Sequence, residues 1–246
     1  MKSLILAAGY ATRMYPITLN VPKPLLPLGG RPAIEHIIKR LEAIKEIERI
    51  FIVTNQKFFH QFQSWQKGFQ AKKPIEIIND KSLAEKGRLG AIGDLSFVLK
   101  KEKIDDDLLV VAGDNIFESA LREFVDFAQH HRPSSSIGLH NLKNKNDVKR
   151  YSQVRLDGSE RVVNFEEKPS RPTSTLVAEC LYFFPREKLG LIAKYINSGG
   201  QTDMPGHYIS WLCQKDSVYG FTFHGKWYDI GSYQIYKKAD EAFKTT

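Results

Sequence analysis

The stretch LILAAGYATRMYPITLNVPKP, residues 4–24, determines how the chain begins. Its apolar start predicts a β-strand, and the small residues that follow, up to Gly9, leave backbone N–H groups uncovered, so that a ligand can approach them closely. Arg13 and Lys23 then place two cations in the same segment, and prolines on both sides of Lys23 restrict its backbone. The stretch therefore predicts a strand that leads into a phosphate-binding loop.

Two familiar glycine-loop motifs do not fit this segment. A dinucleotide-binding loop requires G-x-G-x-x-G, whereas the corresponding positions are Gly9, Ala11 and Met14. A P-loop requires Gly-Lys-Ser/Thr at the start of a helix, whereas Lys23 is followed by Pro24. A merely tight strand-to-helix connection would explain the glycine but not the two cations.

Strands and helices alternate in the first half of the chain. Apolar runs typical of strands alternate with amphipathic stretches typical of helices. This order predicts an α/β fold with a Rossmann-like, mostly parallel central sheet flanked by helices, and it places ligands at the carboxyl ends of the strands. The apolar runs are 4–7, 50–54, 75–78 and 108–111, and the amphipathic stretches are 33–44, 58–65 and 89–99.

The character of the sequence changes at about Ser134. Shorter alternating runs follow, separated by turn residues such as Asp157 and Gly158, and we expect them to form a smaller mixed sheet packed on the first. No repeat or low-complexity linker separates the halves, so we expect a single domain, 1–246, with one lobe at 1–133 plus 220–246 and another at 134–219. The expected strands of the second half are 154–156, 162–165 and 181–184, and the expected helices are 187–197, 205–214 and 234–244.

Composition excludes several other classes of protein. The 246 residues are 42% hydrophobic and 26% charged, which is typical of a globular protein, and no apolar run is long enough for a membrane span or a secretory signal. We therefore expect a cytoplasmic protein with no membrane partner. The net charge of +8 comes from scattered basic residues, so we expect no nucleic-acid partner. Cys180 and Cys213 fit no metal-binding spacing and are expected to be buried thiols.

Two aspartates share a pattern: each lies close to apolar or aromatic residues and within two residues of a glycine. Asp114 ends the strand-like run VVAGD, and Asp229 belongs to WYDIG at 227–231. Alone, Asp114 is better explained as the cap of a helix that starts near Ser119 or as part of a turn, and Asp229 is equally consistent with a helix N-cap. Their presence in a chain that also carries Arg13 and Lys23 favours a shared divalent cation held against phosphate oxygens.

A third motif, EEKP at 166–169, places Lys168 before a proline after a predicted strand. Such a motif alone is typical of a charged hairpin tip. Lysine also binds phosphate as a point charge. The position of Lys168 after the strands of the second half favours a contact with the phosphate of a second substrate.

These motifs together resemble the sugar-phosphate nucleotidyltransferases, enzymes that join a nucleoside triphosphate to a sugar 1-phosphate and release pyrophosphate. The signature L-A-A-G-x-G-T-R-x-x-P-x-T followed by K-P is present, except that Ala11 stands at its second glycine. The resemblance covers nearly the whole chain, because further motifs match in the same order: GRLGAI at 87–92, GDN at 113–115, EEKP at 166–169 and WYDIG at 227–231.

The resemblance implies a role for each lobe and for particular residues. The first lobe would bind the nucleoside triphosphate and the second lobe a phosphorylated small-molecule acceptor, and no left-handed β-helix is expected after the last helix. Catalysis is expected from Arg13, Lys23 and Asp114, and Mg²⁺ binding from Asp114 and Asp229. Nucleotide binding is expected from Leu6, Ala8, Gly9, Thr12, Arg13, Lys23 and Gly90, and acceptor binding from Tyr151, Glu167, Lys168 and Glu179.

Departures from the family pattern leave the substrates open. The resemblance favours dTTP or UTP, but Pro24 stands where the thymidylyltransferases have a glutamine near the base. If Glu179 faces the acceptor, it could bind hydroxyl groups or a cation, so a cytidylyltransferase that acts on an acceptor such as phosphocholine is an alternative. A non-catalytic nucleotide-sensing relative is another alternative. Homo-oligomerisation is possible and is not decided by the sequence.

Overall fold

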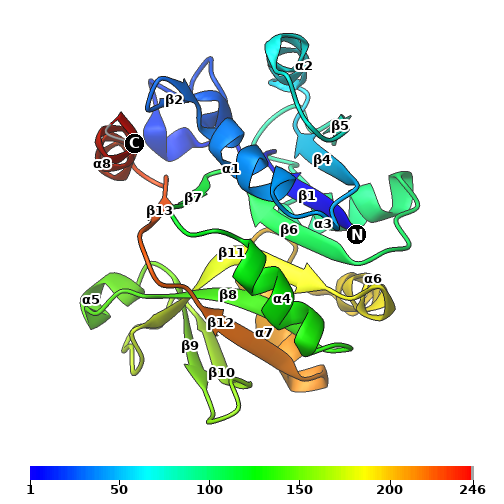
Figure 1. The fold of residues 1–246 in the computed structure, drawn as a ribbon, viewed down its shortest axis with the longest axis vertical. Helices are drawn as coiled ribbons and strands as arrows, with labels where there is room; N and C mark the ends of the chain where they lie inside the picture. The colour runs from blue at the N-terminus through cyan, green and yellow to red at the C-terminus, as the bar shows by residue number, and fades with distance from the viewer. Residues whose placement is uncertain (245–246) are drawn as a thin grey trace.

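A computed structural model describes residues 1–244 and shows one mixed sheet of nine strands that runs through both halves of the chain (Figure 1). The strand order along the sheet is β10-β9-β11-β6-β1-β4-β5, and β8 lies against β11 and β12. Four neighbouring strands pair in parallel: β1 (Lys2–Leu6), β4 (Arg49–Thr54), β5 (Ile75–Asn79) and β6 (Leu108–Ala112). The expected α/β fold with a parallel core is confirmed.

Helices cover both faces of the sheet, and the sequence of β1 shows why. Leu4 packs into one hydrophobic core and Ile5 into the other, because successive side chains of a strand point to opposite faces. One face is covered by α1 (Ala33–Glu42), α2 (Phe59–Gly68), α4 (Arg122–His130) and α8 (Tyr233–Lys244). The other face is covered by α3 (Ala91–Lys101), α6 (Gly190–Asn197) and α7 (Pro205–Lys215).

The second half of the chain extends the first sheet, so the expectation of a separate sheet packed on the first is wrong. The long strand β11 joins the halves, because Leu181–Phe184 pairs antiparallel with Leu108–Val111 of β6. The strands of this half are β8 (Ser135–Asn141), β9 (Ser152–Leu156), β10 (Val162–Glu167), β11 (Leu176–Phe184) and β12 (Val218–Thr222).

Short elements connect these layers. Apart from the nine-stranded sheet, β7 (Asn115–Phe117) and β13 (Trp227–Asp229) form a two-stranded sheet. This pairing brings the last part of the chain next to the strand that follows β6. The remaining short elements are β2 (Pro27–Leu28), β3 (Arg31–Pro32), α5 (Lys145–Val148) and the 3₁₀ turns Thr12–Met14, Lys23–Leu25 and Arg186–Lys188.

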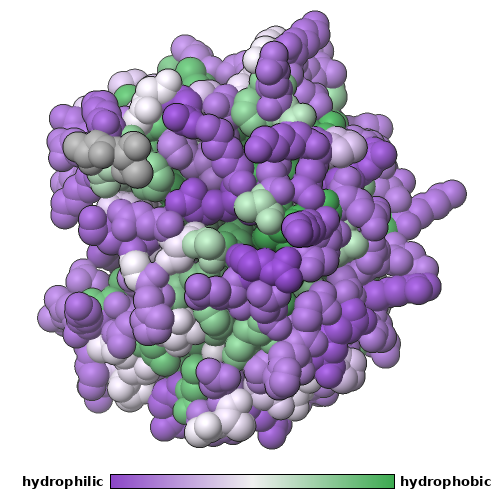
Figure 2. All heavy atoms as spheres, in the orientation of Figure 1, coloured by the Kyte–Doolittle hydropathy of each residue, from purple (hydrophilic) through white to green (hydrophobic). Residues whose placement is uncertain are grey.

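The surface is mostly hydrophilic on the face shown in Figure 2, where hydrophobic residues gather toward the middle and lower part. Among residues 1–244, each helix is either too short or too polar to cross a membrane.

The last helix is anchored at Gly29, in the turn between β2 and β3. The backbone N–H of Gly29 donates a 2.8 Å hydrogen bond to Asp240 Oδ1 of α8. Its φ of +57° lies in the left-handed region, and a Cβ atom there would overlap the Phe243 carbonyl group of the same helix. Gly30 has a φ of +83°, but a Cβ atom there would meet no atom within 4 Å.

These two glycines give a matched test of how α8 is docked. Gly30→Ala carries only the backbone strain of a left-handed residue, and we expect it to lower the free energy of unfolding by about 1 kcal/mol. Gly29→Ala must also displace Phe243, and we expect a loss of about 3 kcal/mol. Urea unfolding of both variants would measure the difference, and equal losses would show that α8 does not depend on this contact.

Candidate active site

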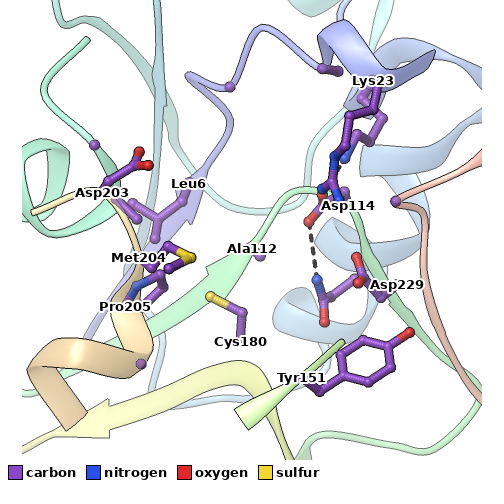
Figure 3. A pocket seen from close by; sticks show the side chains of 18 of the residues that line it. Leu6, Lys23, Ala112, Asp114, Tyr151, Cys180, Asp203, Met204, Pro205 and Asp229 are labelled. Carbon is purple, nitrogen blue, oxygen red and sulfur yellow. Dashed lines mark hydrogen bonds and ion pairs between the residues drawn. The ribbon is translucent and has the colours of Figure 1, made fainter. Parts of the chain in front are cut away.

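A cavity of about 820 Å³ lies over the junction of the two halves of the sheet. Its walls come from the loop after β1, the end of β6, the middle of β11, and the segments around Tyr151, Lys168, Met204 and Asp229. Figure 3 shows Lys23, Asp114 and Asp229 grouped on one side of the cavity, with Asp203, Met204 and Pro205 on the opposite side. The cavity is thus at the carboxyl ends of parallel strands, where ligands bind in open α/β sheets.

The loop after β1 lines the cavity with small residues and with Thr12 and Arg13. Ala11 has a φ of 51° and a ψ of 36°, a left-handed conformation, and Thr18 Oγ1 donates a 2.8 Å hydrogen bond to its carbonyl oxygen. A left-handed residue is unfavourable for alanine and easy for glycine. The glycine of the family pattern at this position is therefore explained by the backbone, and the alanine keeps the same turn.

Lys23 and Asp114 form an ion pair at the centre of the site, with 2.6 Å between Lys23 Nζ and Asp114 Oδ2. Asn115 Nδ2 donates a 3.0 Å hydrogen bond to Asp114 Oδ1, and Trp227 Nε1 donates one of 2.7 Å to Asn115 Oδ1. Burial opposes ionisation of Asp114, but the charge and hydrogen bond of Lys23 outweigh it and lower the pKa of Asp114. Asp114 is therefore a carboxylate at neutral pH.

Asp229 lies next to this pair because β13 pairs with β7. Asp229 is opposite Asn115 in the register, and the Ile230 N–H donates a 3.0 Å hydrogen bond to the Asp114 carbonyl oxygen. Burial and the nearby charge of Asp114 raise the pKa of Asp229 to about 6. Neither aspartate is a helix N-cap, because α4 begins at Arg122 and α8 at Tyr233.

This pair of carboxylates fits a divalent cation. Asp114 raises the pKa of Asp229, and a positive ion between the two carboxylates would relieve this repulsion. Mg²⁺ is commonly held by one or two carboxylates together with substrate phosphates. Residues 1–244 contain no group of three or more acidic, histidine or cysteine side chains arranged to hold a metal by themselves. A cation here would therefore take its other ligands from substrate and water.

The expected acceptor residues Tyr151, Glu167 and Lys168 all line the cavity. Tyr151 lies beside Asp229, whereas Lys168 Nζ is 3.1 Å from Sδ of Met204 on the opposite side (Figure 3). Lys168 has a φ of 47°, and its backbone N–H donates a 3.0 Å hydrogen bond to the Tyr151 carbonyl oxygen, which fixes where its side chain begins. Ser152 Oγ donates a hydrogen bond to Glu167 Oε2. The Tyr151 ring lies 5.3 Å from the Trp227 ring, so aromatic side chains form the wall beside Asp229.

The position of Glu179 contradicts the expectation that it contacts the acceptor. Ala178 and Cys180 line the cavity, and Glu179 between them on β11 points to the opposite face of the sheet. Its side chain is fully buried, and neither carboxylate oxygen has a hydrogen-bond partner among the described residues. Burial raises the pKa of Glu179 well above its usual value and lowers the pKa of His140, whose Nδ1 lies 3.6 Å from Glu179 Oε1.

The other expected residues all line the cavity: Leu6, Ala8, Gly9, Thr12, Arg13, Lys23, Gly90, Asp114 and Asp229.

The structure also shows an ion pair across the cavity wall that the sequence did not indicate, here called the clasp of Arg88 with Asp203. Arg88 donates two 2.8 Å hydrogen bonds to the carboxylate of Asp203 and one of 2.9 Å to Glu85. GRLGAI indicated the loop that carries Arg88, but nothing in the sequence paired it with Asp203. Tyr10 and Asp94 also line the cavity and were not predicted.

The cysteines are free thiols, as expected. Cys180 lines the cavity, and burial raises the pKa of its thiol to about 12. A thiol with so high a pKa is not a nucleophile at neutral pH.

The chain belongs to the nucleotidyl transferase family, whose model matches residues 2–246. It is 28% identical over 235 residues to the bifunctional protein GlmU of Methanocaldococcus jannaschii, a match that covers 94% of this chain and 51% of that protein. It is 30% identical over 231 residues to a Sulfolobus acidocaldarius protein named "Putative mannose-1-phosphate guanyltransferase", covering 94% of this chain and 60% of the relative.

Solved structures share the fold. The crystal structure of apo UDP-glucose pyrophosphorylase matches with a TM-score of 0.82 and 19% identity, covering 99% of this chain and 98% of that chain. The chain spans about half the length of the GlmU proteins that it matches.

Asp229 gives a test of the electrostatics of the carboxylate pair. Because its pKa is raised from about 3.8 to about 6 on folding, the folded state binds more protons than the unfolded state between these values. Its contribution to stability is therefore lost as pH rises through about 6. In metal-free protein at about pH 7.5, we expect Asp229→Asn to raise stability by about 2 kcal/mol and Tm by about 4–8 °C.

The control for this measurement is Asp157→Asn. Asp157 is an exposed carboxylate whose pKa is lowered by hydrogen bonds from Ser159, so this change should not stabilise the protein. Differential scanning calorimetry at several pH values measures both variants. A Tm for Asp229→Asn below that of the parent protein at about pH 7.5 would contradict the raised pKa.

Proposed function

We propose that this protein is a nucleotidyltransferase that joins a nucleoside triphosphate to a sugar 1-phosphate, giving a nucleoside diphosphate sugar and pyrophosphate. The observation that supports the proposal is the group Lys23, Asp114 and Asp229 on one side of the cavity (Figure 3). On the opposite side, Lys168 Nζ lies 3.1 Å from Met204 Sδ. Lys23 and the carboxylate pair suit a triphosphate with its metal ion. Lys168, on the other side of the cavity, suits the phosphate of a second substrate.

The proposed reaction is an in-line displacement at phosphorus. A phosphate oxygen of the acceptor attacks the α-phosphorus of the nucleotide, a new P–O bond forms, and the bond to the β-phosphate oxygen breaks with release of pyrophosphate. The acceptor phosphate has a second pKa of about 6 and is already largely dianionic at neutral pH, so no general base is needed. The main obstacles are repulsion between two anions and charge that develops on the leaving group.

The residues of the cavity act on these obstacles. We propose that Arg13 and Lys23, which line the cavity, bind the triphosphate and neutralise charge on the leaving pyrophosphate, and that Lys168 orients the acceptor phosphate. Asp114 and Asp229 would hold Mg²⁺, which when bound supplies Lewis-acid stabilisation of phosphate charge. Asp114 also orients Lys23 through their ion pair.

The two expected lobes are proposed to bind different substrates. We propose that residues 1–133 and 220–246 bind the nucleotide and that 134–219 bind the acceptor. The family resemblance favours dTTP or UTP, although the relatives and structural neighbours include a protein named for guanyl transfer and one named for UDP-glucose. Because Glu179 is buried away from the cavity, it gives no support to a cationic acceptor such as phosphocholine. We also propose a cytoplasmic location for the reaction.

The test is magnesium-dependent release of pyrophosphate across a grid of nucleoside triphosphates and phosphorylated acceptors. We expect turnover with UTP or dTTP and a sugar 1-phosphate, and none without a divalent cation. Turnover only with CTP and phosphocholine would support the cytidylyltransferase alternative. Nucleotide binding without turnover for any pair would favour a nucleotide-sensing relative.

Substitutions at the two ends of the cavity should have different kinetic effects. Asp114→Asn removes charge at the triphosphate end, and we expect kcat to fall by about 100-fold or more. Lys168→Ala should lower kcat/KM for the acceptor by about 100-fold with little change in KM for the nucleotide. The control is Asp126→Asn on the exposed surface of α4, where the carboxylate pairs with Arg122. Full activity in both site variants would contradict the proposed mechanism.

A further inference from the structure

Lys168, the cation proposed to bind the acceptor phosphate, has an acidic neighbour to which the reaction scheme gives no role. Its ammonium group donates a 3.1 Å hydrogen bond to Sδ of Met204, and Asp203 is the residue before Met204. Figure 3 shows Asp203 and Met204 together on the wall opposite Asp114. A hydrogen bond from Arg88 is the main cause that lowers the pKa of Asp203, and the charge of Lys168 lowers it further, so the two groups lie within electrostatic range.

The ammonium group of Lys168 makes only weak contacts within residues 1–244. A thioether sulfur such as Sδ of Met204 is a weak hydrogen-bond acceptor. Oε1 of Glu167 lies 3.9 Å from Nζ, which is beyond hydrogen-bond distance, and Oε2 accepts a hydrogen bond from Ser152. Half of the Lys168 side chain is exposed. An ammonium group in these surroundings is available to an anion, either the acceptor phosphate or a neighbouring carboxylate.

Arg88 occupies both oxygens of the neighbouring carboxylate. Its Nε donates a 2.8 Å hydrogen bond to Asp203 Oδ1, and its Nη2 donates one of 2.8 Å to Oδ2. Its Nη1 donates a 2.9 Å hydrogen bond to Glu85, so all three nitrogens of the guanidinium group have a partner. Two parallel hydrogen bonds are a strong and specific geometry for an arginine and a carboxylate. In the described part of the chain, Asp203 forms an ion pair with Arg88 and none with Lys168.

The backbone of Asp203 is held against the loop of Arg88 without help from the two side chains. The Ile92 N–H donates a 2.9 Å hydrogen bond to the Thr202 carbonyl oxygen. A Cβ atom at Gly90 would lie 2.5 Å from Asp203 Cα, so the two backbones can approach this closely because residue 90 is glycine. Loss of the Arg88 side chain would therefore leave the Asp203 backbone in place and its carboxylate free to pair elsewhere.

We propose that Arg88 is a positioning residue for the acceptor: by holding Asp203, it prevents this carboxylate from pairing with Lys168 and keeps the ammonium group available to the acceptor phosphate. Arg88 also neutralises the negative charge of Asp203, which would otherwise repel the phosphate. Without Arg88, Asp203 competes with the phosphate for the same ammonium group. This inference rests on the proposed function, since it concerns the binding of the acceptor by Lys168.

Competition of this kind has a specific kinetic effect. A saturating concentration of acceptor displaces Asp203 from Lys168, so Arg88→Gln should raise KM for the acceptor and leave kcat close to that of the parent protein. Ion pairs between exposed side chains are weak, so we expect KM for the acceptor to rise about fivefold. KM for the nucleoside triphosphate should change little.

Asp203→Asn and the double variant separate this role from two others. Asp203→Asn removes the competitor, so alone it should not raise KM for the acceptor, and in combination with Arg88→Gln it should restore the KM of the parent protein. If Arg88 bound the acceptor directly, the double variant would bind it as weakly as Arg88→Gln does. If the clasp acted only by fixing the shape of the wall, Asp203→Asn and the double variant would both raise KM.

The experiment measures steady-state release of pyrophosphate with Mg²⁺ and UTP, dTTP or GTP, with glucose 1-phosphate or mannose 1-phosphate as the acceptor, using the pair that the parent protein turns over fastest. The matched control is Arg122→Gln. Arg122 also pairs with two carboxylates, those of Glu46 and Asp126, but it lies outside the cavity. This variant should keep the KM of the parent protein for both substrates.

A crystal structure of Arg88→Gln gives a second readout, which does not depend on turnover. We expect Lys168 Nζ to lie within about 4 Å of an Asp203 carboxylate oxygen, in place of its contact with Met204. A structure in which Lys168 keeps its contact with Met204 would overturn the inference.

Three kinetic results would also overturn the inference while leaving the proposed function intact. These are an unchanged KM for the acceptor in Arg88→Gln, a raised KM in Asp203→Asn, and a double variant that does not recover. If the parent protein turns over none of the pairs, both the proposed function and the inference fail.

Discussion

The antiparallel pairing of β11 with β6 is the constraint on which the rest of the structure depends. It joins four parallel strands to the strands of the second half in one continuous sheet. The phosphate-binding loop follows a parallel strand, whereas the walls around Tyr151 and Lys168 belong to the other half, so the cavity exists only because the two are held in register. Helices cover both faces of the sheet at this junction, so its strands are buried on both sides. Most of their side chains are therefore apolar.

Charge balance is the second organising feature. The site places Lys23 and Arg13 among carboxylates that burial alone would neutralise, and the different environments of Asp114 and Asp229 move their pKa values in opposite directions. Lys23 keeps Asp114 ionised, while Asp229 retains a proton more readily until a cation arrives. A site with this balance accepts additional positive and negative charge together, as a metal-bound polyphosphate provides.

Local sequence patterns were enough to predict the parallel strands and the residues near them. Gly9 and Asp114 lie just after apolar strands, and Arg13 and Lys23 belong to the segment that follows Gly9. The ends of neighbouring parallel strands must lie together. Side-chain direction was harder, because one step along β11 turns a residue from the cavity to the opposite face; this is why Glu179 was misplaced. The clasp of Arg88 with Asp203 depends on a contact between distant segments, which a single sequence does not specify. Strand β8 was missed because Ser135, Ser136 and His140 weaken its apolar pattern.

The pairing of β13 with β7 has a consequence for how the protein is made. Lys23 and Asp114 leave the ribosome long before Asp229, and at ordinary rates of synthesis the interval is on the order of ten seconds. Throughout that time β7 has no partner strand and the carboxylate pair is incomplete. The complete site can therefore form only after β13 has been synthesised and pairs with β7. Premature termination before β13 would yield a protein with most of its hydrophobic core and only half of its carboxylate pair.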